Sequence, residues 1–128
     1  MRCDERTGLI RAYVDAWLGR DLAAFLATLS DDVCVTECDG HAIGGREACR
    51  KWFKGWHRAP TFGSVDVWDT GRVHCDQDDA ATVEWSFRCT CFGRTTSFDG
   101  ISVSEFADGR ICSIREYRRD VRTPMLMV

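Results

Sequence analysis

Apolar residues recur at helical spacing in three segments of the first 57 residues, which predicts three amphipathic helices. The first covers residues 5–18, where Gly19 favours the end of the helix and Asp21 suits the N-cap of a second helix. The second runs to about Leu29, and the third begins after Gly44-Gly45. The apolar faces of the first and third helices hold Leu9, Ile10, Tyr13, Val14, Trp17 and Leu18, and Cys49, Trp52, Phe53 and Trp56, respectively.

The second half of the chain changes to a period of two residues, which is typical of strands with one buried face. A short strand is predicted earlier, at 33–37, and four longer ones at 63–73, 80–92, 96–106 and 110–119. Helices followed by an antiparallel meander predict an α+β fold in which the helices pack on the sheet. Since no linker or repeat interrupts the pattern, we expect one domain over residues 1–128, with its core at about 8–120.

Strand parity assigns side chains to the two faces of this sheet. The inward set is Ala81, Val83, Trp85, Phe87, Cys89, Cys91, Phe98, Ser102, Ser104, Phe106, Ile114, Glu116 and Arg118. In the last strand, Ile111, Arg115 and Tyr117 then point outward, although Ile111 and Tyr117 could equally define the inner face. A glutamate and an arginine buried on one strand face would need a partner, so we expect a Glu116–Arg118 ion pair or a polar ligand.

Composition and charge exclude several classes of protein. Hydrophobic residues make up 45% and charged residues 29% of 128 residues, as in globular domains, and the formal charge of -3 argues against nucleic-acid binding. No apolar run approaches the roughly 20 residues of a membrane span. The first residues lack the apolar stretch of a signal peptide, so we expect a cytoplasmic protein that binds neither nucleic acid nor membrane.

The eight cysteines are not spaced as a metal or disulfide framework. No Cys-x-x-Cys pair occurs, and the three histidines are scattered, so we expect no metal. We interpret the cysteines as small buried apolar residues in a reducing compartment, with a zinc site built from residues that meet only in space as the alternative. Phosphate-binding glycine loops and nucleophile motifs are also missing, which argues against a cofactor.

The order helix–helix–strand–helix, followed by a long antiparallel sheet, is that of the nuclear-transport-factor-two-like superfamily. Within it, AYVDAWLGRDLAAFLATLSDDVCVTECDG, GGREACRKWF and the Asp-Gly-Arg-Ile that opens the last strand resemble the SnoaL-like and ketosteroid-isomerase-like branch. The resemblance implies a cone-shaped fold, with three N-terminal helices on a curved, mostly antiparallel sheet that encloses a pocket. It names a scaffold that hosts both enzymes and non-enzymes.

The same resemblance implies a candidate site. Tyr13 matches the tyrosine that stabilises an oxyanion in ketosteroid isomerases, and Glu37 matches the carboxylate base. The third position of that pattern, normally an acid, falls on Ser102. Each has a structural alternative, since Tyr13 fits a helix core, Glu37 an exposed turn and Ser102 a small strand residue. His57 could be an auxiliary base or a solvated residue at a helix end.

Aromatic side chains on the predicted inward faces suggest a pocket for a small apolar or cyclic molecule. The residues that we expect to line it are Trp17, Trp52, Phe53, Trp56, Trp85, Phe87, Phe98, Glu116 and Arg118. Two functions fit: a cofactor-independent isomerase, cyclase or lyase acting on a small hydrophobic carbonyl compound, and a module that binds a ligand or dimerises without catalysis. We also expect a homodimer through the outer sheet face, and docking of the apolar tail within residues 121–128.

Overall fold

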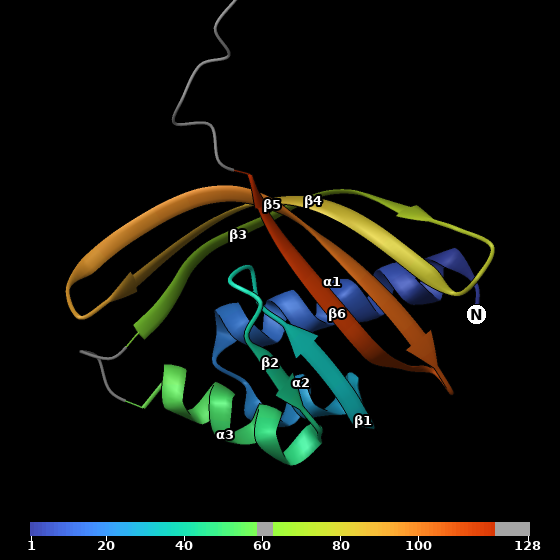
Figure 1. The fold of residues 1–128 in the computed structure, drawn as a ribbon, viewed down its shortest axis with the longest axis horizontal. Coiled ribbons are helices and arrows are strands. Elements are labelled where there is room, and N and C mark those ends of the chain that lie inside the picture. The colour runs from blue at the N-terminus through green and yellow to red at the C-terminus, as the bar shows by residue number, and fades with distance from the viewer. Residues whose placement is uncertain (59–62, 120–128) are drawn as a thin grey trace, which may run out of the picture.

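A curved, open sheet covers three helices that lie against its concave side in a computed structural model, which describes residues 1–58 and 63–119 (Figure 1). The helices are α1 (Cys3–Gly19), α2 (Leu22–Ala27) and α3 (Arg46–Trp56). The strands are β1 (Leu29–Thr36), β2 (Ala42–Gly44), β3 (Gly63–Cys75), β4 (Ala80–Cys91), β5 (Arg94–Ala107) and β6 (Arg110–Arg119), in the sheet order β2-β1-β6-β5-β4-β3. Every neighbouring pair is antiparallel except β1 and β6. This arrangement confirms the α+β fold class.

The junction between α1 and α2 forms as the sequence predicts. Arg20 takes a left-handed conformation (φ 54°) after α1, and the Asp21 side chain accepts a hydrogen bond from the backbone N–H of Ala24, which caps α2. The end of α2 differs from the prediction, because Leu29 is the first residue of β1. The Thr28 carbonyl accepts a hydrogen bond from the N–H of Ile111 at the start of β6. The first strand therefore begins at Leu29, before the predicted start at residue 33.

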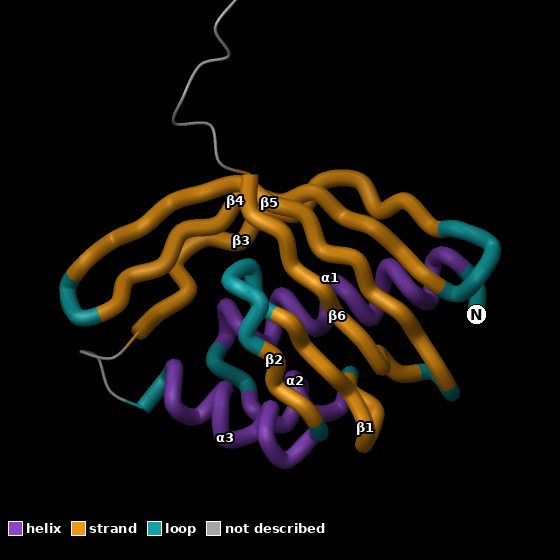
Figure 2. The backbone as a smooth tube through the Cα atoms, viewed as in Figure 1, coloured by secondary structure: helices purple, strands orange, loops and turns teal. Residues whose placement is uncertain are grey.

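The strand β2 was not predicted from the sequence, because three residues are too few to show an alternating pattern. The connection from β1 is a tight turn in which Glu37 N–H donates to the carbonyl of His41 and Gly40 has a φ of 88°. A left-handed φ is readily adopted by glycine, so Gly40 allows this turn to close. Glu37 is thereby held directly after the last residue of β1. Figure 2 shows the chain reversing between β1 and β2.

The parity prediction holds on β4 and β5 but fails at Ile111. Ala81, Val83 and Trp85 are buried, as are Ser102 and Ser104, whereas Ile111 is fully buried rather than outward-facing. The register between β5 and β6 shifts at Glu105/Phe106, where Phe106 pairs with Ile111 and Glu105 with Ser113. This β-bulge adds one residue to β6, so Ile111 and Ile114 both reach the core although they are three apart. Arg115 and Tyr117 keep their predicted outward orientation, and Arg115 forms an ion pair with Glu105 across the outer face.

Aromatic residues of the helices form the centre of the core. Phe25 of α2 stacks on Phe53 of α3 with ring centroids 4.5 Å apart, and Trp17 of α1 packs 4.6 Å from Phe53. Leu18, which the helical spacing placed on the same face, lies next to the last residue of α1 and is 40% exposed. The three predicted helices therefore share one aromatic core beneath the sheet.

The expectation that all eight cysteines are reduced is wrong for two of them, and the expectation that they are buried fails for most of the others. Cys3 at the start of α1 and Cys75 at the end of β3 form a disulfide, although 72 positions separate them. The topology brings these ends together because α1 packs along β3, a proximity that sequence spacing does not reveal. Of the free cysteines, only Cys49 is buried.

No helix of the described residues is both long and apolar enough to cross a membrane. The predicted docking of the tail concerns residues that lie outside the described part of the chain.

Candidate functional site

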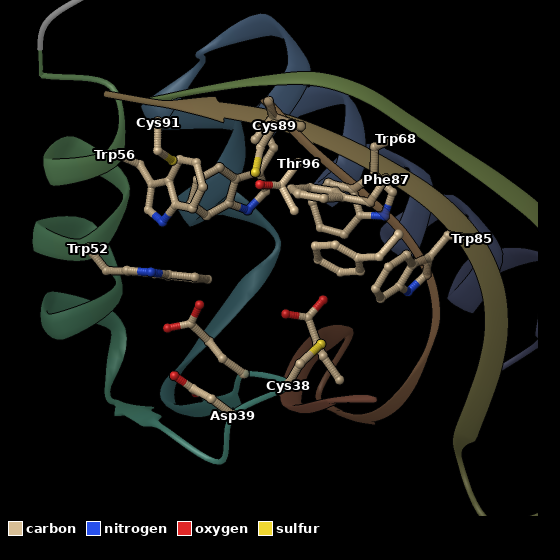
Figure 3. Close-up of a pocket in the computed structure, with 15 residues that line it drawn as sticks. Cys38, Asp39, Trp52, Trp56, Trp68, Trp85, Phe87, Cys89, Cys91 and Thr96 are labelled. Carbon is tan, nitrogen blue, oxygen red and sulfur yellow. The ribbon is translucent and has the colours of Figure 1, made fainter. Parts of the chain in front are cut away.

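A cavity of about 360 Å³ lies between α3, the inner face of the sheet and the turn after β1 (Figure 3). Trp52 and Trp56 approach it from α3, opposite Trp68, Trp85 and Phe87 of the sheet, while Cys38 and Asp39 border it from the turn. Seven aromatic residues line the wall: Trp17, Trp52, Trp56, Trp68, Trp85, Phe87 and Phe98. The remaining lining residues are Glu37, Cys38, Asp39, Val65, Cys89, Cys91, Thr96 and Glu116.

Of the three carboxylates that border this apolar space, Asp39 lies in the turn, and Glu37 and Glu116 lie at corresponding positions of two paired strands. Their proximity follows from the parallel pairing of β1 and β6, where Thr36 is the register partner of Arg115. Glu37 follows Thr36 and Glu116 follows Arg115, so the two glutamates occupy corresponding positions. Residues at corresponding positions of parallel strands point to the same face of the sheet. The one parallel contact in the sheet thus brings together two acids that are 79 positions apart.

Burial and a neighbouring negative charge perturb each of the two carboxyls. Burial raises the pKa of Glu116 to about 7, with the charge of Glu37 as a second cause, while a hydrogen bond from Ser102 acts in the opposite direction. The pKa of Glu37 is also raised, by burial and then by Asp39, against a lowering effect of His41. Near neutral pH, the Glu116 carboxyl is therefore partly protonated.

Ser102 lies behind Glu116 rather than on the wall of the main cavity. Its hydroxyl accepts a hydrogen bond from the indole N–H of Trp85 at 2.8 Å and donates to Oε2 of Glu116 at 3.4 Å. Ser102 is 6% exposed and is the register partner of Glu116 across β5 and β6. The serine is therefore placed to orient the glutamate and to supply it with a hydrogen bond.

Tyr13 is buried in the core and does not line the main cavity. Its hydroxyl is buried and has no hydrogen-bond partner in the described residues, and its ring borders a separate space of about 20 Å³ that Ser102 also lines. Burial, and then the charge of Glu116, raise the pKa of Tyr13 well above its ordinary value. Trp68 and Trp85 line both spaces and so separate the phenol from the larger cavity.

Two of the expected lining residues lie elsewhere. Phe53 is 2% exposed and packs on Phe25 within the helical core, one helical position away from the wall formed by Trp52. Arg118 is exposed, and its guanidinium lies over the ring of Phe98, 4.4 Å from the centroid. Within the described residues it forms no ion pair with Glu116, whose hydrogen bond comes from Ser102.

His57 does not border the main cavity. Its Nδ1 lies 3.0 Å from the carbonyl oxygen of Phe53, and its ring packs against Trp17 with centroids 5.2 Å apart. Burial lowers the pKa of His57, so the imidazole is favoured as the neutral form. It therefore supports the helical core from the end of α3.

The sequence pattern missed Trp68, which lies on the sheet side of the cavity. Val65 and Trp68 both line it although they are three apart, because the pairing of β3 with β4 shifts between Val65 and Val67. A β-bulge reverses the alternation at that point, and simple parity then fails. Cys38 and Asp39 were also missed, since the turn that presents them depends on the unpredicted β2.

Comparisons with known proteins identify the scaffold. The model of the SnoaL-like domain matches residues 10–114, whereas no curated protein is significantly similar to the sequence. An epoxide hydrolase of M. tuberculosis, described as LEH-like, superposes with a TM-score of 0.79 at 21% identity over 91% of this chain and 84% of that one. A nuclear-transport-factor-two-like protein of unknown function from Mesorhizobium loti gives 0.73 at 20% identity over 94% and 95%.

A protein of ketosteroid isomerase-like fold from Catenulispora acidiphila, in complex with trimethylamine, gives a TM-score of 0.72 at 18% identity over 85% of this chain and 83% of that chain. At these identities, the solved structures show a shared fold and leave the activity open. The family match covers most of the chain and agrees with the element order and the curved sheet. The chain belongs to the SnoaL-like family and shares the fold of nuclear-transport-factor-two-like proteins.

Proposed function

We propose that this protein is a cofactor-independent isomerase, cyclase or lyase that moves a proton next to the carbonyl group of a small hydrophobic compound. The single observation that carries the proposal is the pairing of Glu37 with Glu116 on the wall of an aromatic cavity. Two carboxyls in one apolar site repel each other, which favours one ionised and one protonated group. A base and an acid are then available to the same substrate without a metal ion or an organic cofactor.

In the proposed reaction, the ionised Glu37 removes a proton from the carbon next to the carbonyl. The electron pair of that C–H bond forms a C=C bond, and the carbonyl oxygen takes the proton of Glu116, which gives an enol. In a β,γ-unsaturated ketone this enol is a conjugated dienol. Glu37 returns its proton to the γ carbon, the β,γ double bond is replaced by an α,β double bond, and the enol proton returns to Glu116 as the carbonyl re-forms. A positioned base of this kind contributes about 10²–10⁴-fold to the rate.

Glu116 takes the role that family resemblance assigned to Tyr13, as the donor to the developing oxyanion. The raised pKa of Glu116, about 7, supports this role because the carboxyl keeps its proton at a pH where an ordinary glutamate does not. Ser102 would be a positioning residue, since its hydrogen bond runs to Glu116 and not into the cavity. Trp85 fixes that serine through its indole N–H.

The alternative is a module that binds a small ligand without catalysis. The position of Tyr13 favours it, because the phenol is separated from the main cavity by Trp68 and Trp85. Neither Tyr13 nor Ser102 lines the cavity, so neither would donate a hydrogen bond to an oxyanion there. A binding module would need the aromatic walls but neither carboxyl as a proton carrier.

The test uses 3-cyclohexen-1-one, whose isomerisation to the conjugated 2-cyclohexen-1-one raises the ultraviolet absorbance. We expect the wild-type protein to accelerate it, and the near-isosteric Glu37→Gln to lose about 10²–10⁴-fold. Glu84→Gln is the matched control because Glu84 is exposed on β4, away from the inner face. Loss in both variants, or an active Glu37→Gln protein, would remove Glu37 from the role of base. Binding of the ketone without turnover would support the binding module.

A further inference from the structure

We propose that the cavity selects a small organic cation, in the form of an ammonium group carried on an apolar or aromatic body. The inference rests on the same site as the proposed function and adds the charge of the ligand. It follows from which charged and aromatic groups of the described residues face the cavity.

Every charged residue among those that line the cavity is acidic. These are Glu37, Asp39 and Glu116, and no lysine, arginine or histidine of the described residues is part of the wall. A carboxylate or phosphate ligand would therefore enter against like charge with no cation to receive it. A ligand with a positive charge would meet complementary charge on one side of the cavity.

The aromatic walls favour the same charge. The face of an indole or phenyl ring is electron-rich and attracts cations, most strongly for tryptophan. Tryptophans reach the cavity from α1, α3, β3 and β4, so a compact cation could contact rings on several sides. The protein already shows this preference at the edge of the wall, where the Arg118 guanidinium lies 4.4 Å from the centroid of Phe98.

The positive groups near the site leave part of the acidic charge unbalanced. His41 acts on Glu37, and Arg118 acts on Cys38, whose thiol is itself influenced by Glu116. On Glu116, the charged group that acts is Glu37, which repels it, and the hydrogen bond from Ser102 is the stabilising contact. Tyr13, packed beyond Trp85, offers no positive charge. A bound ammonium ion would relieve the repulsion between the two glutamates.

A cationic ligand is compatible with proton transfer between Glu37 and Glu116. An ammonium group close to Asp39 and Glu37 would hold the substrate at the turn and leave its carbonyl free to approach Glu116. An ammonium group close to Glu116 would instead expel the proton from that carboxyl. In either position, ionisation of the pair strengthens binding, so affinity for a permanent cation should rise with pH.

The experiment compares phenyltrimethylammonium with tert-butylbenzene, a neutral molecule of the same shape, and with the anion benzenesulfonate. Quenching of tryptophan fluorescence reports binding, because tryptophans line the cavity. At pH 8, we expect the cation to bind about tenfold more tightly than the neutral isostere, within the range of desolvated cation–π contacts, and the anion to bind more weakly than both. The preference for the cation should diminish at pH 6, where the Glu116 carboxyl gains a proton.

Glu116→Gln should reduce the affinity for phenyltrimethylammonium and leave that for tert-butylbenzene unchanged, whereas Glu84→Gln on the outer face should change neither. Equal affinity for the cation and its isostere, or no binding of the cation at pH 8, would overturn the inference. Isomerisation of cyclohexenone without a cation preference would overturn this inference alone. A cation preference without isomerisation would overturn the proposed enzyme and keep the cation site.

Discussion

Ser102 donates a hydrogen bond to Oε2 of Glu116 at 3.4 Å while it accepts one from Trp85 at 2.8 Å. Its hydroxyl thus links the indole N–H of Trp85 to the Glu116 carboxyl through a chain of two hydrogen bonds. Because the serine donates to the ionised form of Glu116, it lowers the pKa of that carboxyl against the larger effect of burial. Ser102 on β5 therefore adjusts the acidity of Glu116 on β6 from outside the cavity wall.

We expect Ser102→Ala to raise the pKa of Glu116 above about 7 by up to about one unit, the equivalent of one net hydrogen bond. The same change leaves the Trp85 N–H without a partner and should cost about 1–3 kcal/mol of unfolding free energy. Carbon-13 NMR of the Glu116 carboxyl during a pH titration measures the first effect, and urea denaturation the second. Ser104→Ala is the control, since Ser104 is buried on the same face of β5. An unchanged titration of Glu116 in Ser102→Ala would show that this chain of hydrogen bonds does not act on the carboxyl.

Glu116 should also make the stability of the fold depend on pH. Its folded-state pKa of about 7 lies above the ordinary value of 4.5, so the folded state binds more protons than the unfolded state between these values. The free energy of unfolding therefore falls as pH rises from about 4.5 to 7, and Glu116→Gln should remove that fall. We expect the variant to be about 1–3 kcal/mol more stable than the wild type at pH 8 and similar to it at pH 4.5. Urea denaturation at both pH values tests this, and equal effects at the two would contradict it.

The sequence predicted the elements that depend on local periodicity. Residues 81–91 alternate because one face of β4 is buried, and α3 carries its apolar residues on one side, so both could be identified without a structure. The predictions failed where one extra residue in a strand reverses the alternation of inward and outward side chains. The bulges on β3 and β6 moved Trp68 to the cavity and Ile111 to the core, and a bulge leaves little trace in the pattern of apolar residues.

The sequence identified both glutamates of the candidate site, but it did not predict that they lie next to each other. Glu116 was expected on the inner face by parity, and Glu37 by resemblance, yet their juxtaposition depends on the parallel pairing of β1 with β6. Such pairing joins distant segments, and no spacing along the chain specifies it. Arg118 shows the opposite case, a predicted contact that does not form. The alternation along β6 predicted an ion pair between Arg118 and Glu116, whereas the Arg118 guanidinium packs on the ring of Phe98.

Gly100 should be intolerant of any side chain. A Cβ atom there would lie 2.5 Å from the carbonyl oxygen of Tyr117 and would clash with the indole of Trp85. We expect Gly100→Ala to cost about 1–3 kcal/mol or more, because Trp85 would have to leave its bond to Ser102. Gly8→Ala in α1 is the matched control, with open space at its Cβ, and should stabilise the fold by about 0.5–1 kcal/mol. Thermal unfolding distinguishes the two, and a Gly100→Ala protein as stable as the wild type would contradict the packing described.

We expect two copies of the chain to associate through the outer face of the sheet. Ile101 and Tyr117 are register partners on that face, and Tyr117 is 52% exposed, which leaves an aromatic ring uncovered beside a β-branched residue. A self-complementary sheet face of this kind suits a two-fold dimer. Light scattering at micromolar concentration should give twice the chain mass, and Ile101→Lys should give the monomer mass. A wild-type monomer would exclude this interface.

The disulfide between Cys3 and Cys75 fastens the start of α1 to the end of β3, next to a second link made by Arg6. The buried guanidinium of Arg6 donates to the carbonyl oxygens of Asp76 and Ala80 at 2.9 and 2.7 Å, so the helix stays attached to the β3–β4 turn when the covalent link is removed. We therefore expect the double variant Cys3→Ser/Cys75→Ser to fold, with a free energy of unfolding lower by about 2–4 kcal/mol, as for the loss of a disulfide that closes a long loop. A reducing agent should lower the melting temperature of the wild type and leave that of the double variant unchanged. Cys112→Ser, at a free cysteine on β6, is the control and should retain the response to reduction. If the wild type melted at the same temperature with and without the reducing agent, the bond would contribute nothing to stability and Arg6 alone would hold this corner of the fold.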